Sequence, residues 1–536
     1  MKKLKLVCVA IAMASAAPTF AGGLLTNTNQ HVAFNRMMSR EASIGIDGVY
    51  YNPAGVVFMG DGHHLAINWQ LAYQTRTINN DYKLFTNNVN NPITPRDFKG
   101  KAFAPVIPSF QYAYNKGKWS FQANFSLTGG GGKCTFDNGL GSFEKIVSET
   151  AIAACGLAGV VDQTLGNTLG QQGMEMFTSD KAFGKTGKYS FNSYMHGRQY
   201  YYGLSVGAAY KFCDNFSAFL GVRGVYALTN YYGYVENINV GNMPLYKVLD
   251  PTKENAANIE LSCDQTGVGF TPIIGVDYKT GRWNFSAKYE FKTRIRLKNK
   301  SVNQTPSIGN LPANLANQMT GILTARYQQA GLPLEQAKQQ AENTTNTVLS
   351  DPKVGATMMG LKTQFDQKLN KAIGEYEDGK KIAGDIPGYL ALGIGYSPVD
   401  AVRVNVGFHW FDDKNATSYN NRNKELKRGT LEYNAGVEVD VNKKITLSTG
   451  WQNTNYGLSD EYMDDKSFVV SSNSAAIGGV YHINKKMDLN VAYFHTFYQH
   501  KKTSETVQLA ADKSIVYNSD YTRNNNVFAV GLDINF

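Results

Sequence analysis

Four basic residues recur at every second position near the middle of the chain. They are Lys292, Arg294, Arg296 and Lys298, and uncharged residues separate them. Alternate side chains of an extended strand share one face, so the four cations would lie together. Ammonium and guanidinium groups bind carboxylates and phosphates through charge-assisted hydrogen bonds. The cluster is therefore a candidate site for the headgroup of an anionic ligand. Two alternatives stay open: pairing with acids such as Glu432 and Glu438, or with phosphates of a membrane lipid.

Nothing in the sequence forms a catalytic or metal-binding constellation. The eight histidines are scattered, and no serine or cysteine motif accompanies them. The acid pairs Asp412-Asp413 and Asp464-Asp465 lie between predicted strands, where solvation or ion binding accounts for them. A catalytic site needs a nucleophile, a base and an orienting group within reach of one another. We therefore expect no enzyme activity, no cofactor and no bound metal.

The composition excludes several classes of protein. Charged residues make up only 18 % and the mean hydropathy is −0.33, because polar uncharged residues and tyrosine take the place of charge. A helical membrane protein would need repeated apolar stretches of about 20 residues, which this composition does not offer. The net charge is +10, but no lysine or arginine run appears. Nucleic acid is therefore not an expected partner.

The N-terminus predicts export. Three lysines within the first five residues precede an apolar run from Leu6 to Ala17. This order is typical of a secretory signal peptide, here assigned to residues 1–21. Four cysteines remain after cleavage, and an even number in an exported chain permits disulfides. A bridge between Cys134 and Cys155 is one pairing, and the spacing does not fix the connectivity.

Most of the chain alternates between apolar and polar residues with period two. The alternation from Trp283 to Lys298 is longer than a typical strand of about 5–6 residues. Tight turns, such as Lys279 to Arg282, separate some of these segments, and long connections separate the others. This pattern is typical of an outer-membrane barrel, whose apolar face meets lipid and whose polar face lines the lumen. Closure of the barrel satisfies every backbone group, as lipid requires.

The sequence thus predicts an all-β transmembrane barrel of about 14 antiparallel strands within residues 62–536. The basic cluster would then face the lumen. The predicted strands are 62–78, 103–114, 118–129, 197–211, 215–235, 263–279, 282–298, 387–397, 400–412, 427–441, 443–457, 468–483, 487–501 and 523–536.

Residues 22–61 and two long connections do not alternate. A segment of about 40 residues cannot form a sizeable core alone, so residues 22–61 are interpreted as a hatch that plugs the lumen. The connections 130–196 and 299–386 carry apolar residues at helical spacing and are predicted to be helical outer loops. Apolar helix faces with no sheet to cover them often mark a binding groove. The candidate groove residues are Ile152, Leu157, Val160, Leu315, Met319 and Leu323.

The segment from Ser43 to Gly55 resembles the hatch of the outer-membrane long-chain fatty acid and hydrophobic compound transporters (FadL type). Its sequence ends in Asn52, Pro53, Ala54 and Gly55, just before the first predicted strand. The resemblance implies capture of a hydrophobic substrate at the outer loops, a pocket inside the barrel, and a hatch-gated exit through the wall at a kink in the third strand. Residues 31–40 depart from the glycine-rich stretch often found in the family, so ligand contacts by the hatch are expected to differ.

The third predicted strand runs into four glycines. They are Gly129, Gly130, Gly131 and Gly132. Glycines in a strand mark a bulge or a bend and leave the wall without side chains. A flexible start of the next loop is the alternative, and the resemblance favours the kink.

We therefore expect passive uptake of hydrophobic molecules across the outer membrane of a Gram-negative-type bacterium. Long-chain fatty acids are the first expectation, and aromatic or other hydrocarbons are the second. A general porin and an outer-membrane lipolytic enzyme are weaker alternatives, because porins lack such a hatch and no catalytic set is present. An energised transporter would need about 22 strands and a longer chain. The expected partners are the ligand, outer-membrane lipids and lipopolysaccharide, and the protein is expected to be a monomer.

Overall fold

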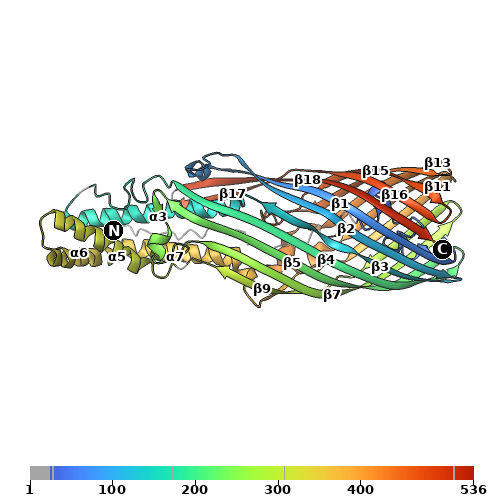
Figure 1. Cartoon of the computed structure of the whole chain (residues 1–536), viewed down its shortest axis with the longest axis horizontal. Coiled ribbons are helices and arrows are strands. Elements are labelled where there is room, and N and C mark those ends of the chain that lie inside the picture. The colour runs from blue at the N-terminus through green and yellow to red at the C-terminus, as the bar shows by residue number, and fades with distance from the viewer. Residues whose placement is uncertain (1–24, 27–28, 172, 307, 511–512) are drawn as a thin grey trace.

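The chain folds into a closed β-barrel with helices gathered at one end (Figure 1). A computed structural model describes residues 25–26, 29–171, 173–306, 308–510 and 513–536. The first strand pairs with both the second and the last, so the sheet closes on itself. The segment assigned to a signal peptide lies outside the described residues.

Fourteen antiparallel strands form the wall, as the alternation predicts, and three of them are interrupted. The uninterrupted strands are β1 (Gly62–Tyr82), β2 (Arg96–Lys116), β3 (Trp119–Phe136), β4 (Tyr189–Cys213), β5 (Phe216–Val240), β7 (Ile259–Thr280), β12 (Val402–Phe411), β13 (Arg428–Asn442), β14 (Ile445–Gly457), β15 (Ser472–Asn484) and β18 (Lys513–Asn535). The interrupted strands are β8 (Trp283–Glu290) with β9 (Arg296–Gln304), β10 (Lys381–Ala383) with β11 (Tyr389–Val399), and β16 (Met487–Tyr498) with β17 (Lys501–Ala510). A two-residue strand, β6 (Met243–Pro244), extends the edge of β5.

The wall is apolar outside and polar inside, the reverse of a soluble barrel. Along β7, Phe270 is 67 % exposed on the outer surface, whereas Gln265 and Asp277 are fully buried in the interior. On β5, Leu220 is 69 % exposed and Thr229 is buried. Lipid solvates such an outer band, and the polar interior binds whatever fills the lumen.

The long connections form a helical cap at one end of the barrel, opposite the short turns and the C-terminus (Figure 1). The helices of this cap are α3 (Gly141–Leu169), α4 (Tyr246–Leu249), α5 (Leu311–Gln329), α6 (Leu334–Leu349) and α7 (Pro352–Ile373). The 3-10 segments at this end are η2 (Lys83–Asn87), η3 (Gly374–Tyr376), η4 (Asp413–Asn415) and η5 (Tyr419–Glu425). The apolar faces of α3, α5, α6 and α7 meet in one hydrophobic cluster, which confirms the predicted helical outer loops. By length and composition α3 could cross a membrane, but it packs in this cluster.

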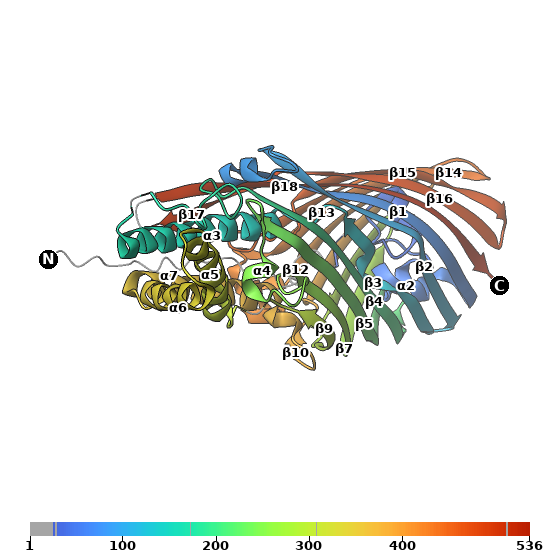
Figure 2. The ribbon, with the colours of Figure 1, turned by 60° about the vertical axis from the view of Figure 1, so that its left-hand side comes forward.

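The N-terminal segment fills the lumen beside the short-turn end (Figure 2). It contains α1 (Val32–Met37), α2 (Gly48–Tyr51) and η1 (Gly55–Met59). Two wall glycines make room for it: a Cβ at Gly450 would lie 1.6 Å from the Met37 carbonyl oxygen, and one at Gly436 would lie 2.1 Å from it. The wall is therefore shaped to the hatch, as the fold prediction requires. The boundary of this hatch at residue 61 stays a prediction.

Candidate functional site

Ion pairs fix the hatch to the wall. Arg36 and Arg40 of the hatch both bind the carboxylate of Glu438 on β13, with 3.0 Å between Arg40 Nη1 and Glu438 Oε2. Arg40 also binds Asp47 within the hatch, at 2.7 Å from Nε to Oδ2. All four side chains are buried. Two residues of the segment 31–40, which departs from the glycine-rich stretch, thus bind the wall or the hatch itself.

His409 of the wall binds a second residue of the hatch, Glu41. His409 Nε2 lies 2.7 Å from Glu41 Oε1, and its Nδ1 lies 2.9 Å from Glu432 Oε2. All three side chains are at most 1 % exposed. Because both ring nitrogens face carboxylates, this histidine links the hatch to β12 and β13.

The hatch motif lies against three strands of the wall. The Asn52 amide donates to Asp277 Oδ2 at 2.6 Å, and its own Oδ1 accepts from the backbone N–H of Gly55. The carbonyl oxygen of Pro53 accepts from Gln122 on β3 at 2.7 Å, and that of Ala54 accepts from Ser217 on β5. The motif is therefore a rigid turn whose polar groups are bound to the wall.

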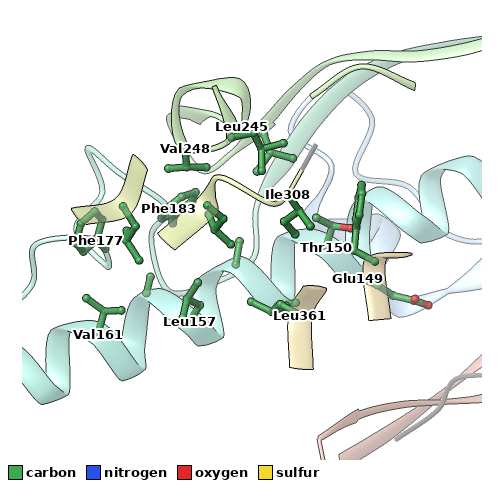
Figure 3. A pocket seen from close by; sticks show the side chains of 17 residues that line it. Glu149, Thr150, Leu157, Val161, Phe177, Phe183, Leu245, Val248, Ile308 and Leu361 are labelled. Carbon is green, nitrogen blue, oxygen red and sulfur yellow. The ribbon is translucent and has the colours of Figure 1, made fainter. Parts of the chain in front are cut away.

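An apolar groove lies in the helical cap (Figure 3). It has a volume of about 850 Å³, and all but two of its seventeen lining residues, Glu149 and Thr150, are apolar. Leu157 and Leu315, two of the predicted groove residues, line it. Met319 and Leu323 are buried behind it, Val160 packs on the same cluster, and Ile152 packs on a neighbouring one.

The sequence did not predict the part of this groove that comes from outside the two long connections. Val248 and Leu249 of α4 line it, together with Leu245 just before this helix. The helix α4 has only four residues, too few to show a helical period in the sequence.

A second apolar pocket of about 800 Å³ continues the groove toward the barrel. The two share Thr150, Leu245 and Phe365. At the barrel side of the second pocket lies Lys466, from the connection between β14 and β15.

Lys466 also lines a third, polar chamber of about 1390 Å³ inside the upper barrel. This chamber shares Met195, Tyr231 and Lys466 with the second pocket. The three spaces therefore adjoin one another, from an apolar groove in the cap to a polar chamber above the hatch.

Two arginines face each other in the polar chamber. Arg76 on β1 and Arg523 on β18 are direct partners in the pairing that closes the barrel. Arg76 Nε and Arg523 Nη2 both donate to Gln74 Oε1, at 3.2 and 2.7 Å. Neither arginine pairs with a carboxylate among the residues that the structure describes, and Arg523 Nε is buried without a hydrogen-bond partner there. The two guanidinium groups therefore lie side by side without a carboxylate partner in the described part of the chain.

The predicted headgroup cluster faces the other way, which corrects the sequence prediction. In β8 the even-numbered Lys288 and Glu290 point inward and are buried. After the break between Glu290 and Arg296, the odd-numbered Ile295 and Leu297 are buried instead.

Arg294, Arg296 and Lys298 are therefore exposed on the outer surface of the barrel rather than in the lumen. Lys292 lies in the break and donates to the carbonyl oxygen of Asn415 at 2.9 Å. A shift of one residue reverses every side chain that follows, and the irregular backbone at 291–295 produces this shift.

Strand pairing between β2 and β3 fails beside the chamber. The pairs Lys101↔Thr135 and Ala102↔Cys134 are followed directly by Ser109↔Ser126, so residues 103–108 and 127–133 do not pair with each other. Pro105 and Pro108 lie in this part of β2 and have no N–H to donate. The opposite edge of β3 remains paired with β4, with bulges at the predicted glycine kink.

The glycines of the kink adopt conformations that other residues rarely adopt. Gly130 has φ 91° and Gly132 has φ 81°, and both line the polar chamber. A Cβ at Gly130 would lie 2.2 Å from the carbonyl oxygen of Gln199 on β4. The chamber thus abuts a stretch of wall where β2 and β3 do not pair with each other and where four successive residues of β3 are glycines.

The four cysteines that the structure describes are free. Cys134 lies in β3 and Cys155 in α3, and they pack in different hydrophobic clusters. The bridge considered between them is therefore absent.

A buried carboxyl group lies beside Lys466, outside the membrane-spanning strands. Burial raises the pKa of Glu375 to about 8, against the opposing effects of Lys466 and Arg422. Burial and repulsion from Asp464 likewise raise the pKa of Asp465 to about 6. The lower rim of the cap thus holds carboxyl groups that stay protonated at pH values where exposed acids are ionised.

The cap should lose stability as the pH rises because of Glu375. Its carboxyl group ionises near pH 4.5 in the unfolded chain and near 8 in the folded one. Between these values only the folded state holds the proton, so stability falls with rising pH. The Glu375→Gln variant should therefore be more stable than the wild type above pH 8, by up to about 5 kcal/mol, and similar to it below pH 5. Melting of the helical circular dichroism signal at several pH values measures this.

Glu377→Gln is the matched control, since the Glu377 side chain is 72 % exposed. It should melt like the wild type at every pH. An equal gain for both variants, or a gain for Glu375→Gln that does not depend on pH, would contradict the assignment.

Comparison with solved structures shows which fold this is. A FadL homologue from Pseudomonas aeruginosa matches with a TM-score of 0.58 and 14 % identity over 96 % of this chain and all of that one. A deltaS2S3 mutant of TodX, a monoaromatic hydrocarbon channel, matches with a TM-score of 0.51 and 12 % identity over 94 % of this chain and 98 % of that one. No family model and no curated protein matches the sequence. The chain therefore has the fold of the FadL-type barrels.

Proposed function

We propose that this chain, which has the FadL-type fold, takes up hydrophobic molecules passively across an outer membrane. The adjoining spaces carry this proposal: an apolar groove in the cap, an apolar pocket below it, and a polar chamber beside the unpaired stretch of β2 and β3. A ligand would enter the groove, pass Lys466, and leave sideways through the wall at Gly129–Gly132. The hatch closes the lumen below the chamber, so a lateral exit avoids its ion pairs.

The chemistry of the groove and of the pocket suits an apolar ligand, since both are lined mostly by apolar residues. Removal of apolar surface from water stabilises a bound ligand by roughly 25 cal/mol per Å². The apolar lining alone serves hydrocarbons and fatty acyl chains equally.

Arg76 and Arg523 favour a long-chain fatty acid over a neutral hydrocarbon. An acyl chain would occupy the apolar pocket while its carboxylate binds the two guanidinium groups. Two partly buried cations lie side by side there without a counter-ion among the described residues, and an anionic ligand would offset their mutual repulsion. The second candidate, an aromatic hydrocarbon, leaves the two arginines without a role and is favoured only by the apolar lining.

Binding to the detergent-purified protein tests the proposal. Radiolabelled oleate and toluene are compared on the wild type and on Leu315→Gln, which places an amide on the groove wall. Ile322→Gln on the same helix is the control, because Ile322 is 45 % exposed. We expect saturable oleate binding that Leu315→Gln weakens about tenfold, since burial of an unpaired amide costs about 1–3 kcal/mol.

The outcomes separate the candidates. Toluene binding without oleate binding would support the hydrocarbon candidate and remove the carboxylate site. Binding of neither ligand, or equal effects of the two variants, would contradict uptake through the groove.

A further inference from the structure

The cations that were expected in the lumen form a basic patch on the outer surface of the barrel. We define this basic patch as Arg294, Arg296, Lys298 and Lys300, with Lys381 on the adjoining strand. Lys381 of β10 is the direct partner of Lys298 on β9, so cations of two strands meet. All five residues are exposed.

The basic patch lies where the apolar outer band ends. On the neighbouring strand β7, Phe270 and Val268 are the last large apolar residues that face outward, at 67 % and 58 % exposed. Thr266 follows and is the partner of Lys298, and Asp264 is the partner of Lys300. The cations thus begin where the apolar outer face of β7 ends, on the side of the helical cap.

Neighbouring acids leave most of this charge uncompensated. Arg296 binds Asp385 at 2.8 Å, yet its side chain remains 53 % exposed. Asp264 accepts a hydrogen bond from Asn230, and Glu377 pairs with Lys380, which lies outside the patch. Arg294, Lys298, Lys300 and Lys381 form no ion pair with any residue that the structure describes.

We propose that the basic patch binds the phosphate groups of lipid A, the membrane anchor of lipopolysaccharide. Lipid A places phosphates on a sugar headgroup directly above acyl chains, which matches cations directly above an apolar band. Arginine binds phosphate through two parallel hydrogen bonds, and lysine contributes point charge. The inference rests on the proposed outer-membrane location, with the cap facing outward, and it does not depend on which ligand is transported.

Lipid A binding to detergent-purified protein tests the patch. The patch variant carries Arg294→Gln, Lys298→Gln, Lys300→Gln and Lys381→Gln; Arg296 is kept because its loss would leave Asp385 unpaired. The control carries Lys443→Gln, Lys444→Gln, Lys485→Gln and Lys486→Gln in exposed turns at the opposite end, an equal change in charge. Heat-dependent migration in gels and helical circular dichroism establish that both variants fold.

We expect the control to bind lipid A like the wild type and the patch variant to bind at least tenfold more weakly. Dephosphorylated lipid A should bind all three proteins equally weakly, and added salt should reduce the difference between them. Equal lipid A affinity of the patch variant and the wild type would overturn the proposal, as would undiminished binding of dephosphorylated lipid A.

Oleate binding, measured on the same preparations, distinguishes this inference from the proposed function. It should be the same in all three proteins, because the patch lies outside the groove and the chamber. If the patch variant lost oleate binding and kept lipid A binding, the cations would collect the transported ligand instead, and the lipid A site would be wrong.

Discussion

Replacement of Gly130 by alanine is expected to reduce uptake more than tenfold while ligand binding remains. A Cβ at this position would lie 2.2 Å from a carbonyl oxygen of β4, and φ is 91°. A left-handed conformation costs a residue with a side chain about 1–2 kcal/mol, in addition to the clash. The backbone is expected to relax by moving away from β4 and straightening β3, which extends its pairing with β2 across residues 103–108. Uptake of radiolabelled oleate by cells, beside binding to purified protein, measures the two effects separately.

Gly117→Ala is the matched control for this experiment. Gly117 lies in the turn between the same two strands and has φ 60°, but a Cβ there would meet no atom within 4 Å. It should lose a little stability and no uptake. Gly132→Ala should be intermediate, because its Cβ would lie 3.3 Å from that of Ala104. Undiminished uptake by a folded Gly130→Ala protein would show that the ligand leaves by another route.

The double variant Arg76→Gln, Arg523→Gln is expected to weaken oleate binding by about 100-fold and to leave toluene binding unchanged. Hydrogen bonds to charged groups contribute about 1.5–3 kcal/mol each, and every 1.4 kcal/mol changes an affinity tenfold. Toluene carries no charge, so its binding should not depend on the two guanidinium groups. Competition binding with oleate, oleyl alcohol and toluene compares the same chain length with and without a carboxylate.

Each single variant should weaken oleate binding about half as much, on a free-energy scale, because one guanidinium group remains to bind the carboxylate. Arg282→Gln and Arg326→Gln are surface controls that should have no effect. If oleate and oleyl alcohol lost affinity equally in the double variant, the arginines would shape the chamber rather than bind a carboxylate.

The barrel could be predicted from the sequence because each strand carries its own alternation. Phe270 and Leu220 must face lipid, and Gln265 and Thr229 must not, whatever the neighbouring strands are. The Asn52–Gly55 turn could be placed in the hatch for a similar reason, since it precedes the first alternating strand directly.

The candidate site could not be predicted in the same way, because its position depends on features that the alternation of apolar and polar residues does not reveal. The exchange of faces between Glu290 and Ile295 arises from irregular backbone, and the sequence there continues to alternate without a break that would reveal it. Arg76 and Arg523 are far apart in the chain and become neighbours only through the register that closes the barrel. Lys466 and α4 line the proposed path of the ligand. They belong to connections whose sequences show neither strand alternation nor helical spacing.

The hatch and the wall act as each other's counter-ions. Without the hatch, Glu438 and Glu432 would line an open, water-filled lumen, and Glu438 would keep only Arg403 of the wall as a counter-ion. With the hatch in place, Arg36 and Arg40 neutralise Glu438, and His409 lies between carboxylates from both sides. Loss of one partner from a buried ion pair costs about 3–5 kcal/mol, so expulsion of the whole hatch would require several such losses at once. A ligand can therefore pass without opening the lumen to ions only if the hatch keeps these ion pairs. Any movement of the hatch would then be confined to the part above them.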